Sequence, residues 1–217
     1  MEKTILLAGK EMPEARSFTD GLKNKSRNSI AADGNKIIWN KASPISARSF
    51  ILQSITQSKN SLDAVLYFDE KSLSAKFSQS DIQTCSQIND EYILSYQYIT
   101  IELLQYFNSH AGKLAFVYNE LPKTASPTCL FLKAAGAAFT AFAESTAETL
   151  SSLPEIKTIL VHNDAANAEY QNDEALSEWI CSYFDALDQI KAQGGSKKTV
   201  SWIKPGSKPS AGFALFH

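Results

Sequence analysis

The chain has 217 residues, of which 44% are hydrophobic and 20% are charged. This content is enough for one well-buried core, so we expect a single domain over residues 1–217. With 21 Lys and Arg residues against 23 Asp and Glu residues, the net charge is −2 and no basic stretch stands out, which argues against nucleic acid or an anionic membrane as the main partner.

Taken in chain order, apolar runs alternate with stretches of helical spacing. The expected strands lie near residues 3–9, 29–32, 36–40, 62–70, 113–120, 156–164 and 199–203, and the expected helices near 13–25, 44–58, 81–108, 130–150 and 174–193, the last followed by Gly194 and Gly195 as a stop. Strands separated by helices of about ten or more residues predict an α/β fold. The fold class is a Rossmann-like, doubly wound and mostly parallel sheet flanked by helices.

One connection departs from this alternation, at residues 29–40. Only Asp33-Gly34-Asn35 separates two of the expected strands, whereas parallel neighbours need a crossover of a dozen or more residues. An Asp-Gly step between two such runs is typical of a tight hairpin turn. We therefore expect an antiparallel pair at one edge of the sheet; the alternative is one bent strand.

Cysteines and histidines give no sign of a disulfide framework or a metal centre. Cys85, Cys129 and Cys181 form no Cys-x-x-Cys pair, and the three histidines are scattered along the chain. We expect no metal and a reducing, cytoplasmic environment. We also expect no signal peptide and no membrane span, because the apolar runs are too short for either.

Four stretches carry a resemblance to a known family. They are "LLAGKEMPEA" after the first expected strand, "LDAVLYFDE", "GKLAFVYNE" and "CLFLKAAGAAFTAFAESTAETL". In order and spacing they resemble the glycine-rich turn, the Asn-Asn-Ala-Gly strand, the serine strand and the Tyr-x-x-x-Lys helix of the short-chain dehydrogenase/reductase family. The resemblance covers most of the chain and implies the same Rossmann-like fold.

The resemblance also implies where catalytic residues would lie. In that family the helix lysine holds the nicotinamide ribose and lowers the pKa of the tyrosine, which acts as acid or base. Lys133 matches the lysine, but Cys129 stands at the tyrosine position, and the serine region reads Tyr118-Asn119-Glu120. We therefore interpret Lys133 as a remnant and expect no dehydrogenase activity.

The glycine-rich loop has changed as well. Its glycines let backbone N–H groups approach a pyrophosphate at a helix N-terminus. Here only Gly9 remains, with Pro13 and Ala15 at the later glycine positions, and Glu11 and Glu14 add negative charge. Two unit charges about 5 Å apart repel by roughly 3 kcal/mol at an effective dielectric of about 20. We expect no bound cofactor, and NAD(P) if there is one.

Cys129 has a second interpretation, as a nucleophile. A helix N-terminus and a lysine one turn away both lower the pKa of a thiol. The alternative is a small buried hydrophobic residue beside Leu130 and Phe131. Rapid alkylation near neutral pH, lost in Cys129→Ser, would distinguish a reactive thiol from a buried one.

Residues 130–143 are apolar on nearly every side of the expected helix, which indicates burial on more than one side. In the resembled family this helix and the preceding long helix form a dimer interface. We therefore expect a homodimer through helices at about 88–108 and 130–150; the alternative is packing inside a monomer. The expected contact residues are Ala134, Ala137, Ala138, Ala141, Tyr96 and Leu103.

Three functional hypotheses follow from these features. The first is a non-catalytic binding or scaffolding subunit on the short-chain dehydrogenase fold, with an unknown ligand. The second is an NAD(P)-dependent oxidoreductase with atypical active-site residues, and the third is a thiol-dependent enzyme that uses Cys129. Because a fold alone does not establish an activity, nucleotide binding is the measurement that separates the first from the second.

Overall fold

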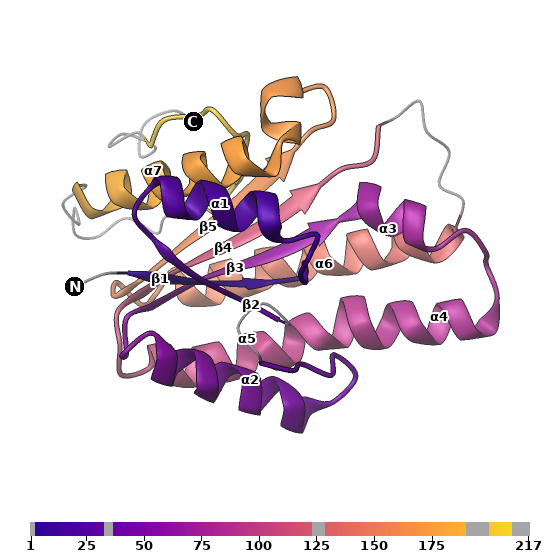
Figure 1. The fold of residues 1–217 in the computed structure, drawn as a ribbon, viewed down its shortest axis with the longest axis horizontal. Helices are drawn as coiled ribbons and strands as arrows, with labels where there is room; N and C mark the ends of the chain where they lie inside the picture. Colours follow the sequence, from indigo (N-terminus) through magenta and orange to yellow (C-terminus); the bar gives the residue numbers. More distant parts are fainter. Residues whose placement is uncertain (1–2, 33–36, 123–128, 190–199, 210–217) are drawn as a thin grey trace.

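The computed structural model describes residues 3–32, 37–122, 129–189 and 200–209 (Figure 1). Within these ranges the strands form one parallel sheet in the order β2-β1-β3-β4-β5-β6. The strands are β1 (Thr4–Ala8), β2 (Asn28–Ala31), β3 (Leu62–Asp69), β4 (Gly112–Asn119), β5 (Ile156–Asn163) and β6 (Trp202–Ile203).

Helices cover both faces of this sheet. They are α1 (Arg16–Asn24), α2 (Pro44–Gln57), α3 (Glu70–Lys76), α4 (Ile82–Asn89), α5 (Ser95–Phe107), α6 (Leu130–Leu150) and α7 (Asp173–Gln189), with a π-helical turn η1 (Asp90–Leu94) and a 3-10 turn η2 (Ala168–Gln171). Helices α1 and α7 lie together on one face, and α2, α5 and α6 lie on the other (Figure 1). The predicted fold class is therefore confirmed.

The central strands separate two apolar layers. All eight residues of β3 are buried, as expected for a parallel strand with helices on both sides. Alternate residues point to opposite faces, so Leu66 packs toward α2, α5 and α6, while Val65 packs toward α1 and α7. The strands therefore read as continuous apolar runs in the sequence.

Helices α1 and α7 approach each other closely because α1 carries a glycine at the contact. A Cβ atom on Gly21 would lie 2.1 Å from the Ser177 hydroxyl oxygen and 2.4 Å from the Glu174 carbonyl oxygen. Any larger residue would push the helices apart. This contact holds the start of α7 beside the turn that follows β1.

The predicted antiparallel pair is wrong. Strand β2 pairs parallel to β1, with Leu7 opposite Ala31, and residues 37–40 form no strand. Ile37 and Trp39 are buried instead, and the Trp39 ring stacks on Phe50 of α2 at 5.3 Å. Their alternation reflects an extended segment packed on a helix, not a ladder. The expected turn at Asp33-Gly34 and the stop at Gly194-Gly195 lie outside the described residues.

Candidate functional site

The strand order places a candidate site at the carboxyl ends of β1 and β3. The chain runs from β1 outward to β2 and then crosses to β3 on the other side of β1. In open parallel sheets, ligands bind in the crevice where the strand order reverses in this way. Gly9 and Lys10 follow β1 at this point, and Asp69 ends β3.

Lys10 is held there between two carboxylates. Its Nζ lies 2.8 Å from Oδ2 of Asp69 and also pairs with Asp173 at the start of α7. The same ammonium lies 4.5 Å from the centre of the Tyr67 ring, and the Lys10 side chain is only 9% exposed. We call Lys10, Asp69 and Asp173 the switch-point cluster.

The charges of this cluster stabilise one another. Burial lowers the pKa of Lys10, but the carboxylates of Asp69 and Asp173 outweigh burial, so the pKa lies above its ordinary value. Burial raises the pKa of Asp69, but Lys10 and hydrogen bonds from Ser72 and Asn119 outweigh it, so this pKa is lowered. One lysine between two carboxylates leaves the cluster with a net charge of −1.

Hydrogen bonds extend the cluster along the edge of the sheet. Asn119, which ends β4, donates from Nδ2 to Asp69 over 2.9 Å, and Asn163, which ends β5, donates to Oδ1 of Asn119 over 3.1 Å. Asp69 also accepts the Ser72 hydroxyl at 2.6 Å and caps α3. The ends of β3, β4 and β5 are therefore joined by one polar network.

A cavity of about 300 Å³ opens above the switch-point cluster. Every described residue that lines it carries a charge, an amide or a hydroxyl group: Lys10, Ser17, Asp69, Lys71, Ser72, Asn119, Gln171, Asn172 and Asp173. These residues come from the ends of β1, β3 and β4, from the first turns of α1, α3 and α7, and from η2 and the residue that follows it. This cavity is the candidate binding site at the polar edge of the sheet.

Gly9 is required by the protein's own backbone. Its φ is +110°, and a Cβ atom would lie 1.9 Å from the Tyr67 carbonyl oxygen and 2.6 Å from the Tyr96 hydroxyl. The Tyr96 hydroxyl donates to that same carbonyl over 2.7 Å. The glycine therefore permits a close contact between the turn and β3.

Three backbone donors of the turn after β1 and the start of α1 are used inside the protein. The N–H of Met12 donates to Ala32, that of Ala15 to Glu11 and that of Arg16 to Pro13, while Pro13 has no donor. A dinucleotide pyrophosphate needs several free N–H groups at this place. These three N–H groups are therefore not available to such a group.

A second polar cluster joins β4 to α6. Glu70, which is fully buried, accepts the Tyr118 hydroxyl at 2.8 Å and the Leu121 N–H at 3.1 Å. Its other oxygen lies 2.9 Å from Nζ of Lys133, whose side chain is 51% exposed. Lys133 is thus paired with a carboxylate that stands between it and Tyr118.

This arrangement works against acid–base chemistry by Tyr118. Burial raises the pKa of Tyr118, and the hydrogen bond to Glu70 raises it further. A tyrosine that acts as a base needs a lowered pKa, which an unpaired lysine would supply. Here the charge of Lys133 is offset by Glu70.

Cys129 is placed at the N-cap position of α6 and is fully buried in the apolar layer. Its side chain makes no capping hydrogen bond. Reactive cysteines are partly exposed to solvent, whereas buried ones are inert. The position favours the interpretation of Cys129 as a small hydrophobic residue.

The predicted contact residues divide into two groups. Ala134, Ala137 and Ala141 are exposed along the outer side of α6, and Ala138 is half-buried. Tyr96 and Leu103, at 2% and 0% exposure, are inside the monomer and cannot form a surface contact. Including them was wrong, because the side of α5 that carries them faces the sheet and α6; the Tyr96 ring packs on Phe139 of α6 at 5.0 Å.

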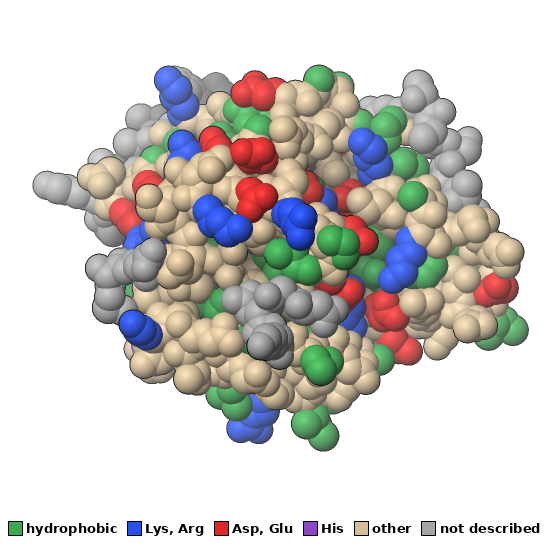
Figure 2. Space-filling view, viewed as in Figure 1, with side chains coloured by type: hydrophobic (Ala, Val, Ile, Leu, Met, Phe, Trp, Pro, Cys, Tyr) green, Lys and Arg blue, Asp and Glu red, His purple; other side chains and the backbone are tan. Residues whose placement is uncertain are grey.

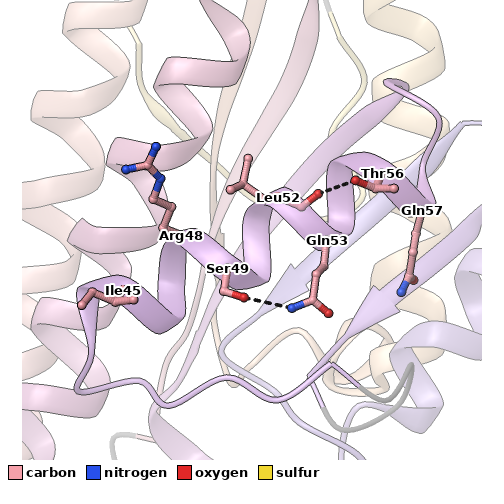
Figure 3. A pocket seen from close by; sticks show the side chains of 7 residues that line it. All are labelled: Ile45, Arg48, Ser49, Leu52, Gln53, Thr56 and Gln57. Atoms are coloured by element: carbon pink, nitrogen blue, oxygen red, sulfur yellow. Dashed lines mark hydrogen bonds between the residues drawn. The ribbon is translucent and has the colours of Figure 1, made fainter.

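A larger hollow, of about 490 Å³, lies on the outer side of α2 (Figure 3). The described residues that line it all belong to one helix, and Ile45 and Leu52 are exposed there beside the charged Arg48. It is therefore a shallow surface feature away from the polar edge of the sheet. Figure 2 shows charges of both signs interspersed over the visible face, without a patch of one sign.

Two further classes of site can be judged from the described ranges of the chain. There, no group of three or more His, Cys, Asp or Glu side chains is placed to hold a metal ion. Nor does any helix in these ranges have both the length and the apolar character that a membrane crossing requires.

No family model matches the chain. A protein of Treponema pallidum (strain Nichols), described as uncharacterized, is 23% identical and aligns over 94% of this chain and 93% of its own. Solved structures with a similar fold include short-chain dehydrogenases.

The structure from Rhodopseudomonas palustris has a TM-score of 0.62 at 12% identity and covers 96% of this chain and 99% of its own. The structure from Mycobacterium smegmatis has a TM-score of 0.62 at 13% identity and covers 96% of this chain and 93% of its own. A third structure is an oxidoreductase of the short-chain dehydrogenase/reductase family from Brucella ovis, in complex with a partially ordered NAD. It has a TM-score of 0.60 at 10% identity and covers 84% of this chain and 92% of its own. At these identities the likeness shows the fold, which is that of the short-chain dehydrogenases.

Sequence reasoning missed most of the polar site. It singled out Gly9, Cys129 and Lys133, none of which is among the described residues that line the cavity. It did not assign Lys10, Asp69, Glu70 or Asp173. A usable signal was present, since Lys10, Asp69 and Asn119 each stand at or just after the end of an apolar run that predicts a parallel strand.

Proposed function

We propose that this protein is a non-catalytic member of the short-chain dehydrogenase fold that acts as a binding or scaffolding subunit. The observation that carries the proposal is the switch-point cluster, in which Lys10 is bound internally by Asp69 and Asp173. The crevice that receives a dinucleotide in related folds here contains a self-paired ionic network.

The electrostatics of the crevice support the proposal. The cluster carries a net charge of −1, which repels a pyrophosphate. Glu11, in the turn after β1, is partly exposed and pairs with Lys41 at 3.0 Å, while Glu14 is exposed without an ion-pair partner among the described residues. Together with the three internally used N–H groups, the carboxylate of Glu14 disfavours an anionic ligand.

The second polar cluster supports the absence of dehydrogenase activity. Reduction of a carbonyl requires an acid to protonate the developing alkoxide. Tyr118 is a phenol in the stretch that resembles the family's serine strand. It donates a hydrogen bond to Glu70, which raises the pKa of Tyr118. Lys133 cannot lower the pKa of Tyr118 while it is paired with Glu70.

Titration with NADH and NADPH tests the proposal. We expect no binding below millimolar concentration, by nucleotide fluorescence and by thermal shift. Circular dichroism of the same sample would establish that the protein is folded. A micromolar dissociation constant for either nucleotide would overturn the proposal.

The alternative is an NAD(P)-dependent oxidoreductase with atypical residues. What favours it is the fold shared with NAD-bound oxidoreductases, and the presence of Tyr118 and Lys133 on either side of one carboxylate. Turnover of NADPH with a panel of aldehydes and ketones, lost in Tyr118→Phe and kept in Tyr98→Phe, would establish it. For a thiol enzyme using Cys129, the matching test is fast alkylation at neutral pH.

As a subunit, the protein is expected to assemble as a homodimer through α6. The exposed small residues Ala134, Ala137 and Ala141 would let a second α6 approach closely. Ala137→Glu should convert the dimer to a monomer in light scattering, whereas Ser182→Glu, on the exposed side of α7, should not. A monomeric unmodified protein at micromolar concentration would rule out this assembly.

A further inference from the structure

We infer that the cavity above the switch-point cluster binds a small, uncharged ligand rich in hydroxyl groups, of about monosaccharide size. The inference rests on the proposed function, because the same cavity would otherwise belong to a dinucleotide. It is argued from the hydrogen-bonding capacity, the charge and the volume of the cavity.

The free hydrogen-bonding groups of the cavity include both donors and acceptors. Asp173 accepts the Tyr67 hydroxyl at 2.9 Å and pairs with Lys10, which leaves about two of its four acceptor positions open. Asp69 already accepts from Lys10, Ser72 and Asn119 and has no such capacity. The open acceptor on the floor is therefore Asp173.

The rim supplies the complementary groups. Nδ2 of Asn172 and Nζ of Lys71 have no partner among the described residues and are donors. Gln171 uses its amide nitrogen for Asn119 and for the Asp164 carbonyl, so its oxygen remains as an acceptor. A hydroxyl group both donates and accepts, and neighbouring hydroxyls match this alternation of donors and acceptors.

The charge and the volume of the cavity further restrict the class of ligand. The floor carries −1 and disfavours an anion, while Lys71 at the rim carries +1 and disfavours a cation. None of the described side chains that line the cavity is apolar, so an apolar ligand gains nothing from contact with them. A volume of about 300 Å³ is at the lower end of the range for small-molecule sites. A neutral polyol fits all of these conditions.

The test uses D-ribose, D-glucose and myo-inositol as probes, with inorganic phosphate and NADH beside them. Binding to the full chain is measured by saturation-transfer difference NMR and calorimetry. We expect at least one polyol to bind with a millimolar or tighter dissociation constant, and phosphate to bind more weakly. If no polyol binds, the inference is wrong.

Two variants locate the binding. Ser17 lines the cavity from the exposed side of α1, so Ser17→Tyr should fill it and weaken polyol binding by about tenfold or more. Ser182→Tyr makes the same change on the exposed side of α7 and should have no effect. Equal affinities in the two variants would place any binding elsewhere and overturn the inference.

The outcomes separate the inference from the proposed function. Absence of both polyol and NADH binding would remove the inference alone and leave the non-catalytic function in place. Micromolar binding of NADH, lost in Ser17→Tyr, would overturn both. Circular dichroism of Ser17→Tyr shows whether a loss of binding comes from a filled cavity or from unfolding. If Ser17→Tyr is unfolded, Lys71→Met replaces it in the comparison with Ser182→Tyr.

Discussion

The two ends of the sheet carry ionic clusters of opposite design. At the carboxyl end, one lysine, Lys10, lies between two carboxylates. At the amino end, one carboxylate, Asp188, lies within 3.1 Å of three lysine ammonium groups, those of Lys3, Lys113 and Lys157. We call this second group the amino-end cluster. In each, the central charge comes from one residue and is surrounded by the opposite sign.

The clusters differ in their exposure to water. The three side chains of the switch-point cluster are 7–15% exposed. In the amino-end cluster Lys3, Lys157 and Asp188 are 34–37% exposed, and Lys113, at 5%, is buried. Asp188 lies in the last turn of α7, and Lys157 also donates to the Leu187 carbonyl, so the lysines stabilise the negative end of this helix. Ion pairs in water contribute little, while a buried charge without its partner is costly.

The largest expected effect is therefore that of Lys10→Met, which leaves two buried carboxylates without a cation. We expect a loss of about 3–5 kcal/mol in the free energy of unfolding, measured by urea denaturation. Lys23→Met, at an exposed lysine of α1 that pairs with Asp20, is the matched control and should cost less than about 1 kcal/mol. A similar small cost for both variants would mean that the switch-point cluster is solvated.

The pH dependence of stability should sharpen the comparison. The pKa of Asp69 is lower in the folded protein than in the unfolded chain, so its contribution is present above about pH 4 and is lost as the pH falls through the folded value. The pKa of Lys10 is raised, so its contribution is present below about pH 10 and is lost as the pH rises through the folded value.

In Lys10→Met, the burial of Asp69 is no longer offset by a cation, and its pKa should rise above the ordinary value. Acid should then destabilise the variant less than the unmodified protein. Urea denaturation between pH 3 and pH 7 measures this. Parallel curves for the two proteins would contradict the coupling between Lys10 and Asp69.

The smallest expected effect is that of Asp188→Asn. Burial raises the pKa of Asp188, but hydrogen bonds from Lys113, Lys3 and Lys157 outweigh it and hold the pKa well below its usual range. Because Asp188 is more than one third exposed, we expect a cost of only about 1 kcal/mol, which 1 M salt should largely remove. The cost of Lys10→Met should persist in salt, and a loss of both would show that burial does not distinguish the clusters.

Most elements of the fold could be predicted because their signal is local. Apolar runs such as Leu62–Asp69 become buried strands, and helical spacing in Asp173–Gln189 becomes α7. The prediction of a hairpin was wrong because an extended segment that packs Trp39 on a helix has the same alternation of buried and exposed residues as a paired strand. Tyr96 and Leu103 were wrongly expected at a dimer contact, because an apolar side of a helix does not indicate whether a sheet or a second molecule covers it.

The sequence was sufficient to identify an α/β chain with one glycine, Gly9, in the turn after its first strand and with Cys129 at the start of a long helix. Both follow from residue identity and local spacing. The pairing of Lys10 with Asp173, across 163 residues, depends on the order β2-β1-β3 and on the contact of α1 with α7. Burial, and with it the charge state of a group, is set by elements distant in the chain, so the site appears only after the chain has folded.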